Sequence, residues 1–163
     1  MDFLLYIAII TTIFPYIVYA MAYKYPNITK KYMTQKQIIQ IGQWFKVIEA
    51  LCSLPTFYNA CFNGSGMIFG LPLIFMGQYL NQLVYATIGE AGVYYGYELK
   101  TIKPRIINIF PFTLGDPQYK GAILTVIGGS LCINTTRDLI IIDITWMFCY
   151  FSGLVIEHTE TIY

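Results

Sequence analysis

Charged residues are scarce in this sequence, and two long stretches contain none. Lys, Arg, Asp and Glu make up 12% of the 163 residues, whereas 56% are hydrophobic. No charged residue lies between Asp2 and Lys24 or between Glu49 and Glu90. Soluble domains carry about 25% charged residues, so this distribution excludes an ordinary soluble protein. We expect an integral membrane protein built as a single domain over residues 1–163.

The sequence also lacks a strong net charge and any motif for metal binding. Its ten Lys and Arg nearly balance its nine Asp and Glu, so no excess of positive charge attracts nucleic acid. No pair of cysteines has the C-x-x-C spacing of a zinc or redox site. We expect no metal, no nucleic-acid partner, and free thiols packed as small apolar groups at Cys52, Cys61, Cys132 and Cys149.

The uncharged stretches are long enough to cross a lipid bilayer as helices. About 20 apolar residues of helix span the hydrocarbon core, and the backbone must bond within itself because lipid offers it no partners. The stretches do not alternate as barrel strands do. The expected fold class is all-α, a polytopic membrane helical bundle of about four embedded helices plus a short re-entrant or interfacial helix. The four are expected at residues 3–23, 38–60, 71–92 and 139–156, and the short one at 121–133.

The first stretch shares some features with a secretory signal peptide, because Ala20-Met21-Ala22 ends an apolar run. Asp2, however, stands where a signal peptide carries basic residues, and the run continues to Tyr23. We therefore expect a first helix that is retained in the protein.

Basic residues gather in two loops between the expected helices. The first loop contains Lys24, Lys30, Lys31 and Lys36, and the second contains Lys100, Lys103, Arg105 and Lys120. If the second and third helices both cross the bilayer, the two loops lie on the same side of it. The positive-inside rule favours that arrangement.

Three charged residues fall inside apolar helices. Lys46 and Glu49 are three residues apart, and therefore on one face of the second helix, and Asp143 lies in the last helix. An unpaired charge in lipid is costly, so we expect Lys46 and Glu49 to pair with each other or to face the bundle interior. A small transporter or channel component is an alternative that depends only on these three residues.

Four short motifs follow one another in the second half of the chain: Gly89-Glu90-Ala91-Gly92, then Gly96, then Ile109-Phe110-Pro111-Phe112, and then Asp116-Pro117-Gln118-Tyr119-Lys120-Gly121. The phosphatidylethanolamine N-methyltransferases have a comparable G-x-A-G, a later glycine, an aromatic-Pro-aromatic element and an N-P-x-Y-x-G element at similar spacing. Over nearly its whole length the sequence resembles this family of small helical membrane enzymes. The resemblance implies S-adenosylmethionine as the cofactor and a membrane phospholipid as the acceptor.

The resemblance also implies which residues form the site. In the family, a G-x-G in the third helix and a Glu-Glu pair at the end of the last helix hold the cofactor. The corresponding positions here are Phe75-Met76-Gly77 and Glu157-His158. We expect the cofactor to be bound by Gly77, Gln78, Glu90, Gly92 and Glu157, and the catalytic residues to be His158 and Tyr119. His158 would take the proton of the head-group ammonium, because the unperturbed pKa of histidine lies near neutrality.

Two departures from the family pattern concern this cofactor. Phe75 has a large side chain where the family has glycine, and a cofactor packed against that backbone would clash with it. His158 replaces a negative charge with a group that is neutral or positive near neutral pH, which weakens the attraction for the positive groups of the cofactor. The site also requires the third and last helices to meet at one face of the membrane, in a chamber floored by Gly77 and rimmed by Glu157.

Two functions therefore stay open at this point. The first is an active S-adenosylmethionine-dependent phospholipid N-methyltransferase. The second is a catalytically silent, lipid-binding subunit that works with other membrane protein subunits in a larger complex, for example in the mitochondrial inner membrane. The isoprenylcysteine carboxyl methyltransferases are a related alternative for the substrate class. The endoplasmic reticulum and the mitochondrial inner membrane both fit the sequence as the location.

Overall fold

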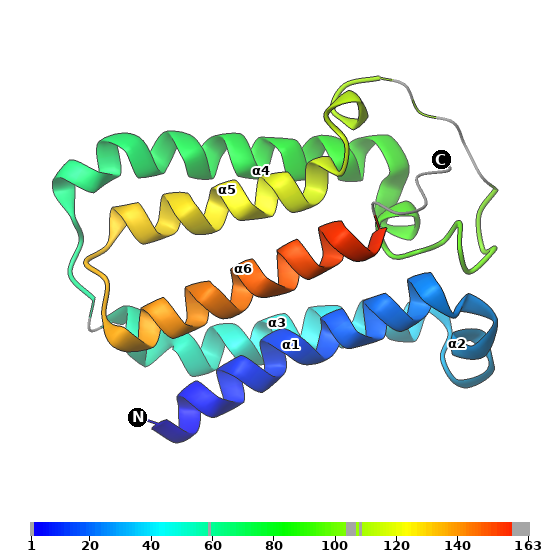
Figure 1. Cartoon of the computed structure of the whole chain (residues 1–163), viewed down its shortest axis with the longest axis horizontal. Coiled ribbons are helices and arrows are strands. Elements are labelled where there is room, and N and C mark those ends of the chain that lie inside the picture. Colours follow the sequence, from blue (N-terminus) through cyan, green and yellow to red (C-terminus); the bar gives the residue numbers. More distant parts are fainter. Residues whose placement is uncertain (1, 59, 104–106, 108, 158–163) are drawn as a thin grey trace.

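The computed structural model describes residues 2–58, 60–103, 107 and 109–157. This part of the chain folds into six α-helices and one short 3-10 helix (Figure 1). In chain order they are α1 (Asp2–Lys24), α2 (Pro26–Tyr32), α3 (Gln35–Tyr58), α4 (Gly64–Val93), η1 (Phe112–Leu114), α5 (Pro117–Cys132) and α6 (Arg137–Glu157). The all-α bundle predicted from the sequence is confirmed.

The long helices form two packed pairs that are joined by α6. α4 packs along α5, α1 packs along α3, and α6 contacts both α1 and α5. Figure 1 shows α4 and α5 on one side of the bundle, α1 and α3 on the other, and α6 between them. Although α3 and α4 are consecutive in the chain, each packs mainly on another helix. The side of the bundle between α3 and α4 is therefore not sealed by helix packing along its length.

Glycines allow α4 and α5 to approach each other closely. A Cβ atom on Gly77 would lie 2.3 Å from the carbonyl oxygen of Gly121, and one on Gly70 would lie 2.4 Å from that of Gly128. Small residues at a helix contact let backbones come together, which matters in a membrane because the hydrophobic effect does not drive helices together there. These glycines hold α4 against α5 over about two helical turns.

Three helices are long and apolar enough to cross a membrane, namely α1 from Phe3, α4 and α6. Large apolar side chains point outward from the bundle, and Phe69, Phe75 and Phe148 are each at least 66% exposed. α3 also carries exposed apolar side chains, including Leu51. Such a surface is stable in lipid and not in water. The chain is an integral membrane protein, as the sequence predicted.

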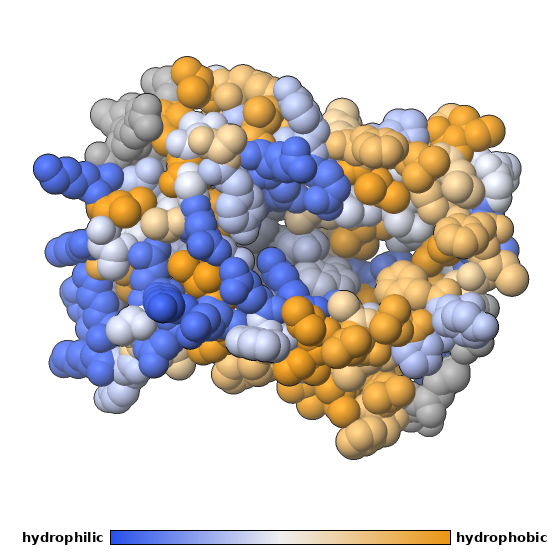
Figure 2. Space-filling model, turned by 180° about the vertical axis from the view of Figure 1, so that it is seen from behind, coloured by the Kyte–Doolittle hydropathy of each residue, from blue (hydrophilic) through white to orange (hydrophobic). Residues whose placement is uncertain are grey.

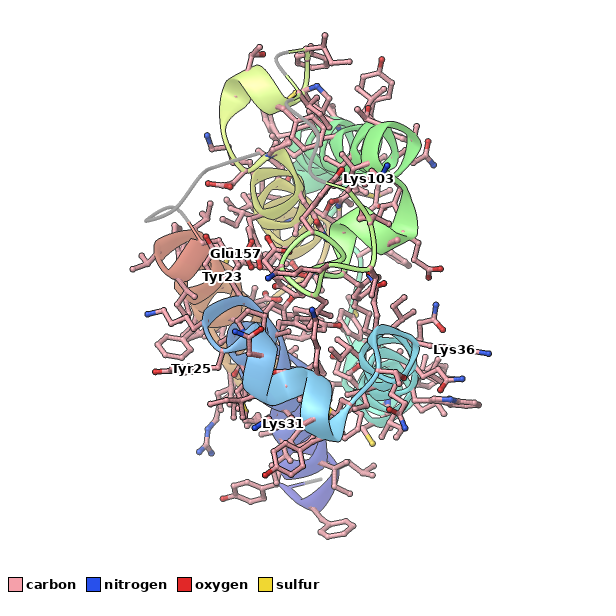
Figure 3. The ribbon with its side chains drawn as sticks, turned by 90° about the vertical axis from the view of Figure 1, so that its right-hand side faces the viewer. Tyr23, Tyr25, Lys31, Lys36, Lys103 and Glu157 are labelled. Atoms are coloured by element: carbon pink, nitrogen blue, oxygen red, sulfur yellow. The ribbon has the colours of Figure 1, made fainter. Side chains whose placement is uncertain are left out.

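One end of the bundle is polar, and we call it the polar end. The segments that join α1 to α3 and α4 to α5 both lie there, together with the last turn of α6 (Figure 1). Figure 2 shows hydrophilic side chains gathered at this end, on its left, and mostly apolar side chains at the other. Lys31, Lys36 and Lys103 are spread over the polar end in Figure 3. The two basic loops thus share one end of the bundle, while Arg105 lies outside the described residues.

A break near the end of α4 turns the chain back into the bundle. Gly89 has φ 69° and ψ 172°, a combination that is essentially restricted to glycine. Tyr94 and Tyr95 follow the break and are both buried. Tyr95 has φ 59°, which is uncommon for an aromatic residue. The break thereby places two tyrosines in the core, where they pack with Val18, Tyr19, Ala22, Ile38 and Leu99.

Candidate functional site

A cavity of about 450 Å³ lies inside the bundle. Side chains from α1, α3, α4, α5 and α6 line it, together with Tyr94 and Tyr95. Its volume is typical of a site for a small molecule. Most lining residues are aromatic or polar, for example Tyr16, Tyr85, Trp146, Tyr150, Gln118 and Thr125. A lining of this kind inside an apolar bundle indicates a binding site.

Glu157, the last residue of α6, is held in the cavity wall by tyrosines. Tyr95 Oη donates a hydrogen bond to Glu157 Oε1 at 2.6 Å, and Tyr119 Oη donates to the same oxygen at 2.5 Å. Tyr23 Oη donates to the main-chain carbonyl of Glu157 at 3.0 Å, and Figure 3 shows these two residues next to each other at the polar end. No described residue donates a hydrogen bond to Oε2 of Glu157. The carboxylate is therefore fixed in orientation and still able to accept hydrogen bonds from a ligand.

The surroundings of Tyr95 keep its hydroxyl group protonated. Burial, then the neighbouring Tyr119 and Glu157, raise the pKa of Tyr95 well above its ordinary value. A neutral hydroxyl group can donate to Glu157, whereas an ionised one would repel it. Tyr95 reaches this position in a left-handed backbone conformation, and such strained positions are often found at functional sites.

Glu49 and Lys46 of α3 line the same cavity, deeper in the bundle. Glu49 is 8% exposed, and its Oε1 accepts hydrogen bonds from Ser53 Oγ and Trp146 Nε1, both at 3.4 Å. Lys46 forms no ion pair with Glu49. The expected pairing is therefore absent: both residues line the cavity, with Glu49 buried and Lys46 exposed. Trp146 lies about three turns before Glu157 on α6, so the two carboxylates stand at opposite ends of the cavity.

Aromatic rings line the deep part of the cavity beside Glu49. The ring centroids of Trp146 and Tyr150 are 5.4 Å apart and the rings are stacked. Tyr16 meets Trp146 at 6.3 Å and Tyr150 at 5.7 Å, in both cases edge to face. The faces of such rings attract cations, methylated ammonium groups in particular. A carboxylate beside aromatic rings makes this part of the cavity suitable for a positively charged group.

Three of the residues expected in the site line this cavity, namely Gln78, Tyr119 and Glu157. Gln78 Nε2 donates a hydrogen bond to Thr125 Oγ1 at 3.2 Å. Gly92 lines a smaller neighbouring cavity of about 40 Å³, together with Tyr95, Tyr119 and Glu157. Burial raises the pKa of Glu98, which also lines that smaller cavity. Of the two glycines expected to bind the cofactor, Gly92 thus shares a cavity with Glu157 and Gly77 does not.

The other expected residues lie elsewhere. Gly77 faces α5, where its backbone contacts Gly121 and Thr125, and the adjacent Gln78 is the residue that shares the cavity with Glu157. Glu90 is exposed and accepts a hydrogen bond from Gln43 Nε2 at 3.1 Å. His158 lies outside the described residues. Phe75 is 71% exposed on the outer surface of α4, so its side chain does not occupy the cavity.

Some lining residues carry no motif that would identify them in the sequence. Tyr95 is one of 15 tyrosines, and only the break at Gly89 shows why this one is turned inward. Trp146 and Tyr150 are four residues apart on α6 and share a face, but the spacing alone also suits lipid-facing residues. Their role in the cavity wall becomes visible only when α1, α3 and α6 are placed together.

The fold and this cavity define a membrane-embedded helical protein with an internal site for a small molecule, and comparison with known proteins gives its family. Residues 65–163 match the model of the phospholipid methyltransferase family. The chain is 37% identical over 115 residues to a phosphatidyl-N-methylethanolamine N-methyltransferase of Arabidopsis thaliana, covering 70% of this chain and 66% of the relative. No solved structure matches the chain. The chain belongs to the phospholipid methyltransferase family, as the sequence motifs predicted.

The matched region contains only part of the cavity wall. It begins in the first turn of α4 and includes Tyr95, Tyr119 and Glu157. Lys46 and Glu49 of α3 lie before it, as do the cavity residues of α1. Glu157 and the two tyrosines that bind its carboxylate therefore come from the region that matches the family model, and Lys46 and Glu49 come from a helix that precedes it.

Proposed function

We propose that the chain is an S-adenosylmethionine-dependent methyltransferase that acts on the amine of a phospholipid head group, with the 450 Å³ cavity as its active site. One observation carries this proposal: the Glu157 carboxylate is held by Tyr95 and Tyr119 at one end of a cavity with aromatic walls. These residues lie in the region that matches the family model. The proposal therefore rests on the oriented carboxylate of Glu157 as well as on membership of the family.

The residues at this end of the cavity fit the cofactor. S-adenosylmethionine carries an α-ammonium group and a sulfonium group, both positively charged. Glu157 would hold the ammonium group, and the rings of Tyr19 and Tyr95, with centroids 5.9 Å apart, would offer their faces to the sulfonium. The Gln78 side chain would supply hydrogen bonds to uncharged polar atoms. When bound, the cofactor would supply a methyl group that its sulfonium charge already activates.

The chain itself would position the reacting groups, exclude water and accept a proton. Tyr95 and Tyr119 keep Glu157 in one orientation, so that the carboxylate does not have to reorganise when a cation enters. Tyr119 also presents its hydroxyl group to the cavity, within reach of a bound amine. His158, which follows Glu157 in the chain, is the residue we propose as acceptor of the amine proton.

The acceptor we propose is a phospholipid whose ethanolamine group is already partly methylated. The Arabidopsis relative is named for phosphatidyl-N-methylethanolamine. Aromatic walls favour methylated ammonium groups, because these keep their positive charge while becoming less strongly hydrated. The rings of Trp146 and Tyr150 supply such a wall. This acceptor thus suits both the relative's name and the lining of the cavity.

A catalytically silent, lipid-binding subunit of a larger membrane complex is the second candidate. The observation in its favour is His158, which stands where the resemblance implies a second glutamate. The other departure, Phe75, lies on the outer surface of α4 and leaves the cavity open. This position of Phe75 supports the active enzyme, which we favour over the silent subunit.

Cofactor binding and methyl transfer together test the proposal. Purified protein in detergent should bind labelled S-adenosylmethionine saturably in equilibrium dialysis and transfer the label to phosphatidyl-N-methylethanolamine. Tyr119→Phe should lower kcat/KM by about 10- to 150-fold, because a hydrogen bond to a charged group contributes about 1.5–3 kcal/mol. Tyr79→Phe is the matched control, since Tyr79 is 58% exposed on α4 outside the cavity.

The outcomes separate the two candidates. Absence of binding at millimolar cofactor would reject the enzyme. Saturable binding without transfer to any amine-bearing phospholipid would instead support the silent subunit. If Tyr119→Phe and Tyr79→Phe behaved alike, the role assigned to Tyr119 would be wrong.

A further inference from the structure

Two opposite charges, Lys46 and Glu49, face the cavity without pairing with each other. Glu49 is buried, and among the described residues its carboxylate accepts hydrogen bonds from Ser53 and Trp146 alone, both at 3.4 Å. Lys46 makes no hydrogen bond or ion pair with any residue that the structure describes. The buried carboxylate of Glu49 is costly inside an apolar bundle unless it is compensated, and the exposed Lys46 lines the same cavity. A ligand that carries both a negative and a positive group would compensate both.

The spacing of the pair suits one such ligand. Residues three apart on a helix have Cβ atoms about 5–6 Å apart on the same face. A phosphoethanolamine group joins a phosphate to an ammonium group through two carbons, which separates its charges by a similar length. We propose that Lys46 binds the phosphate and Glu49 the ammonium group of a zwitterionic phospholipid. This inference rests on the proposed function and adds the residues that select the head group, at the end of the cavity opposite Glu157.

The aromatic residues around Glu49 support the proposal that Glu49 binds the ammonium group. Trp146 Nε1 donates to the Glu49 carboxylate, and Tyr150 and Tyr16 pack against the indole ring. As methyl groups replace N–H groups, an ammonium loses hydrogen bonds to a carboxylate but keeps its attraction to aromatic faces. Glu49 with these rings therefore accepts both unmethylated and partly methylated amines.

The position of Lys46 indicates how the lipid enters. At the polar end, Gln35 Nε2 donates to the carbonyl oxygens of Ala91 and Tyr94 at 2.7 and 3.0 Å. Gln43 binds Glu90 at 3.1 Å. These contacts join α3 to α4 at that end, whereas Lys46 is exposed about one turn deeper.

Figure 2 shows a hollow in the middle of one side of the bundle, with hydrophilic side chains on its border. Helix packing leaves the space between α3 and α4 unsealed. A head group that enters between these helices reaches Lys46 while its acyl chains stay beside the apolar outer surface. Because the acyl chains stay in the membrane along this route, the ligand that we propose is a membrane lipid.

Lipid binding can be followed without methyl transfer. The chain has two tryptophans, and Trp44 is 65% exposed on the outside, so Trp44→Phe leaves Trp146 as the fluorescent reporter in the cavity. Dihexanoyl phosphatidyl-N-methylethanolamine and dihexanoyl phosphatidic acid would be titrated in detergent. Lys46→Gln should weaken binding of both lipids about tenfold. Glu49→Gln should weaken binding of the zwitterionic lipid by a similar factor and leave that of phosphatidic acid unchanged.

Matched variants separate a lost contact from a lost fold. Lys46→Arg and Glu49→Asp retain the charges and should restore most of the affinity. Lys36→Gln removes a lysine at the polar end, outside the cavity, and should change nothing. Binding of S-adenosylmethionine should be unaltered in the Lys46 and Glu49 variants. Variants that keep this cofactor binding and also bind the zwitterionic lipid like the wild type would overturn the inference.

Two further results distinguish this inference from the function on which it rests. If the wild type binds no cofactor but shows the expected lipid pattern, the enzyme proposal fails and the head-group site stands. If methyl transfer occurs with an unchanged KM for lipid in both Gln variants, the enzyme stands and the head-group site fails. Equal affinity for water-soluble glycerophospho-N-methylethanolamine would overturn the assignment to a membrane lipid.

Discussion

Replacement of Gly77 by alanine should destabilise the protein by forcing α4 away from α5. The added Cβ would lie 2.3 Å from the carbonyl oxygen of Gly121 and 2.5 Å from Thr125 Oγ1. The hydroxyl group can rotate away, but the backbone carbonyl cannot, so the two helices must shift. Overpacking of this kind costs about 1–3 kcal/mol, and the better helix propensity of alanine returns up to about 1 kcal/mol.

Gly129 of α5 offers a matched control, because a Cβ there would meet nothing within 4 Å. Gly129→Ala gains the same propensity without the clash, so Gly77→Ala should be less stable by about 1–3 kcal/mol. Reversible unfolding by SDS in mixed micelles measures the difference. Because Gly77 does not line the cavity, the folded variant should bind S-adenosylmethionine like the wild type. Equal stability of the two variants, with cofactor binding lost only in Gly77→Ala, would refute this reasoning and support the cofactor role implied by the motif.

Two further predictions concern the polar end. Gly89→Ala should lower the unfolding temperature relative to Gly129→Ala, because alanine at φ 69° and ψ 172° is strained by about 1–3 kcal/mol, and an equal melting curve by circular dichroism would contradict this. Burial raises the pKa of Glu98 above its ordinary value of 4.5, so the folded state favours the protonated form and loses stability as the pH rises through that range. Glu98→Gln mimics the protonated form, so it should raise the unfolding temperature near pH 7.5 and have little effect near pH 4. A shift of the same size at both pH values would show that the pKa of Glu98 is not raised in the folded state.

Composition was sufficient to predict the class of fold, since lipid leaves few alternatives to helices. The ends of the helices were harder to place. The third helix was expected over residues 71–92, yet Asn63 Oδ1 accepts a hydrogen bond from the Gly66 amide at 3.2 Å, and α4 begins at Gly64. The first helix was expected to end at residue 23, and Pro26, shortly after that end, is the first residue of α2. Residues that break one helix can begin the next, because proline and a side-chain cap both suit a first turn.

The motifs led to Gln78, Tyr119 and Glu157, which the structure places on one cavity. They could not predict the direction in which Gly77 faces, because neighbouring residues on a helix point about 100° apart and packing against α5 sets the rotation of α4. The separation of Lys46 from Glu49 was also beyond the sequence. A mutual ion pair and two charges that line a cavity separately satisfy the same spacing, and only the positions of Trp146 and the cavity distinguish them.

The cavity wall is assembled from the region that matches the family model and from the helices that precede it. The region that matches the family supplies the Glu157 end, whereas Tyr16, Lys46 and Glu49 come from the first 64 residues. Substitutions in α1 and α3 can therefore reshape the deep end without moving the carboxylate that Tyr95 and Tyr119 hold. A chimera could join α4–α6 of this protein to the N-terminal helices of a relative. It would exchange one part of the cavity wall and conserve the other, so the boundary before α4 is a suitable point for engineering selectivity.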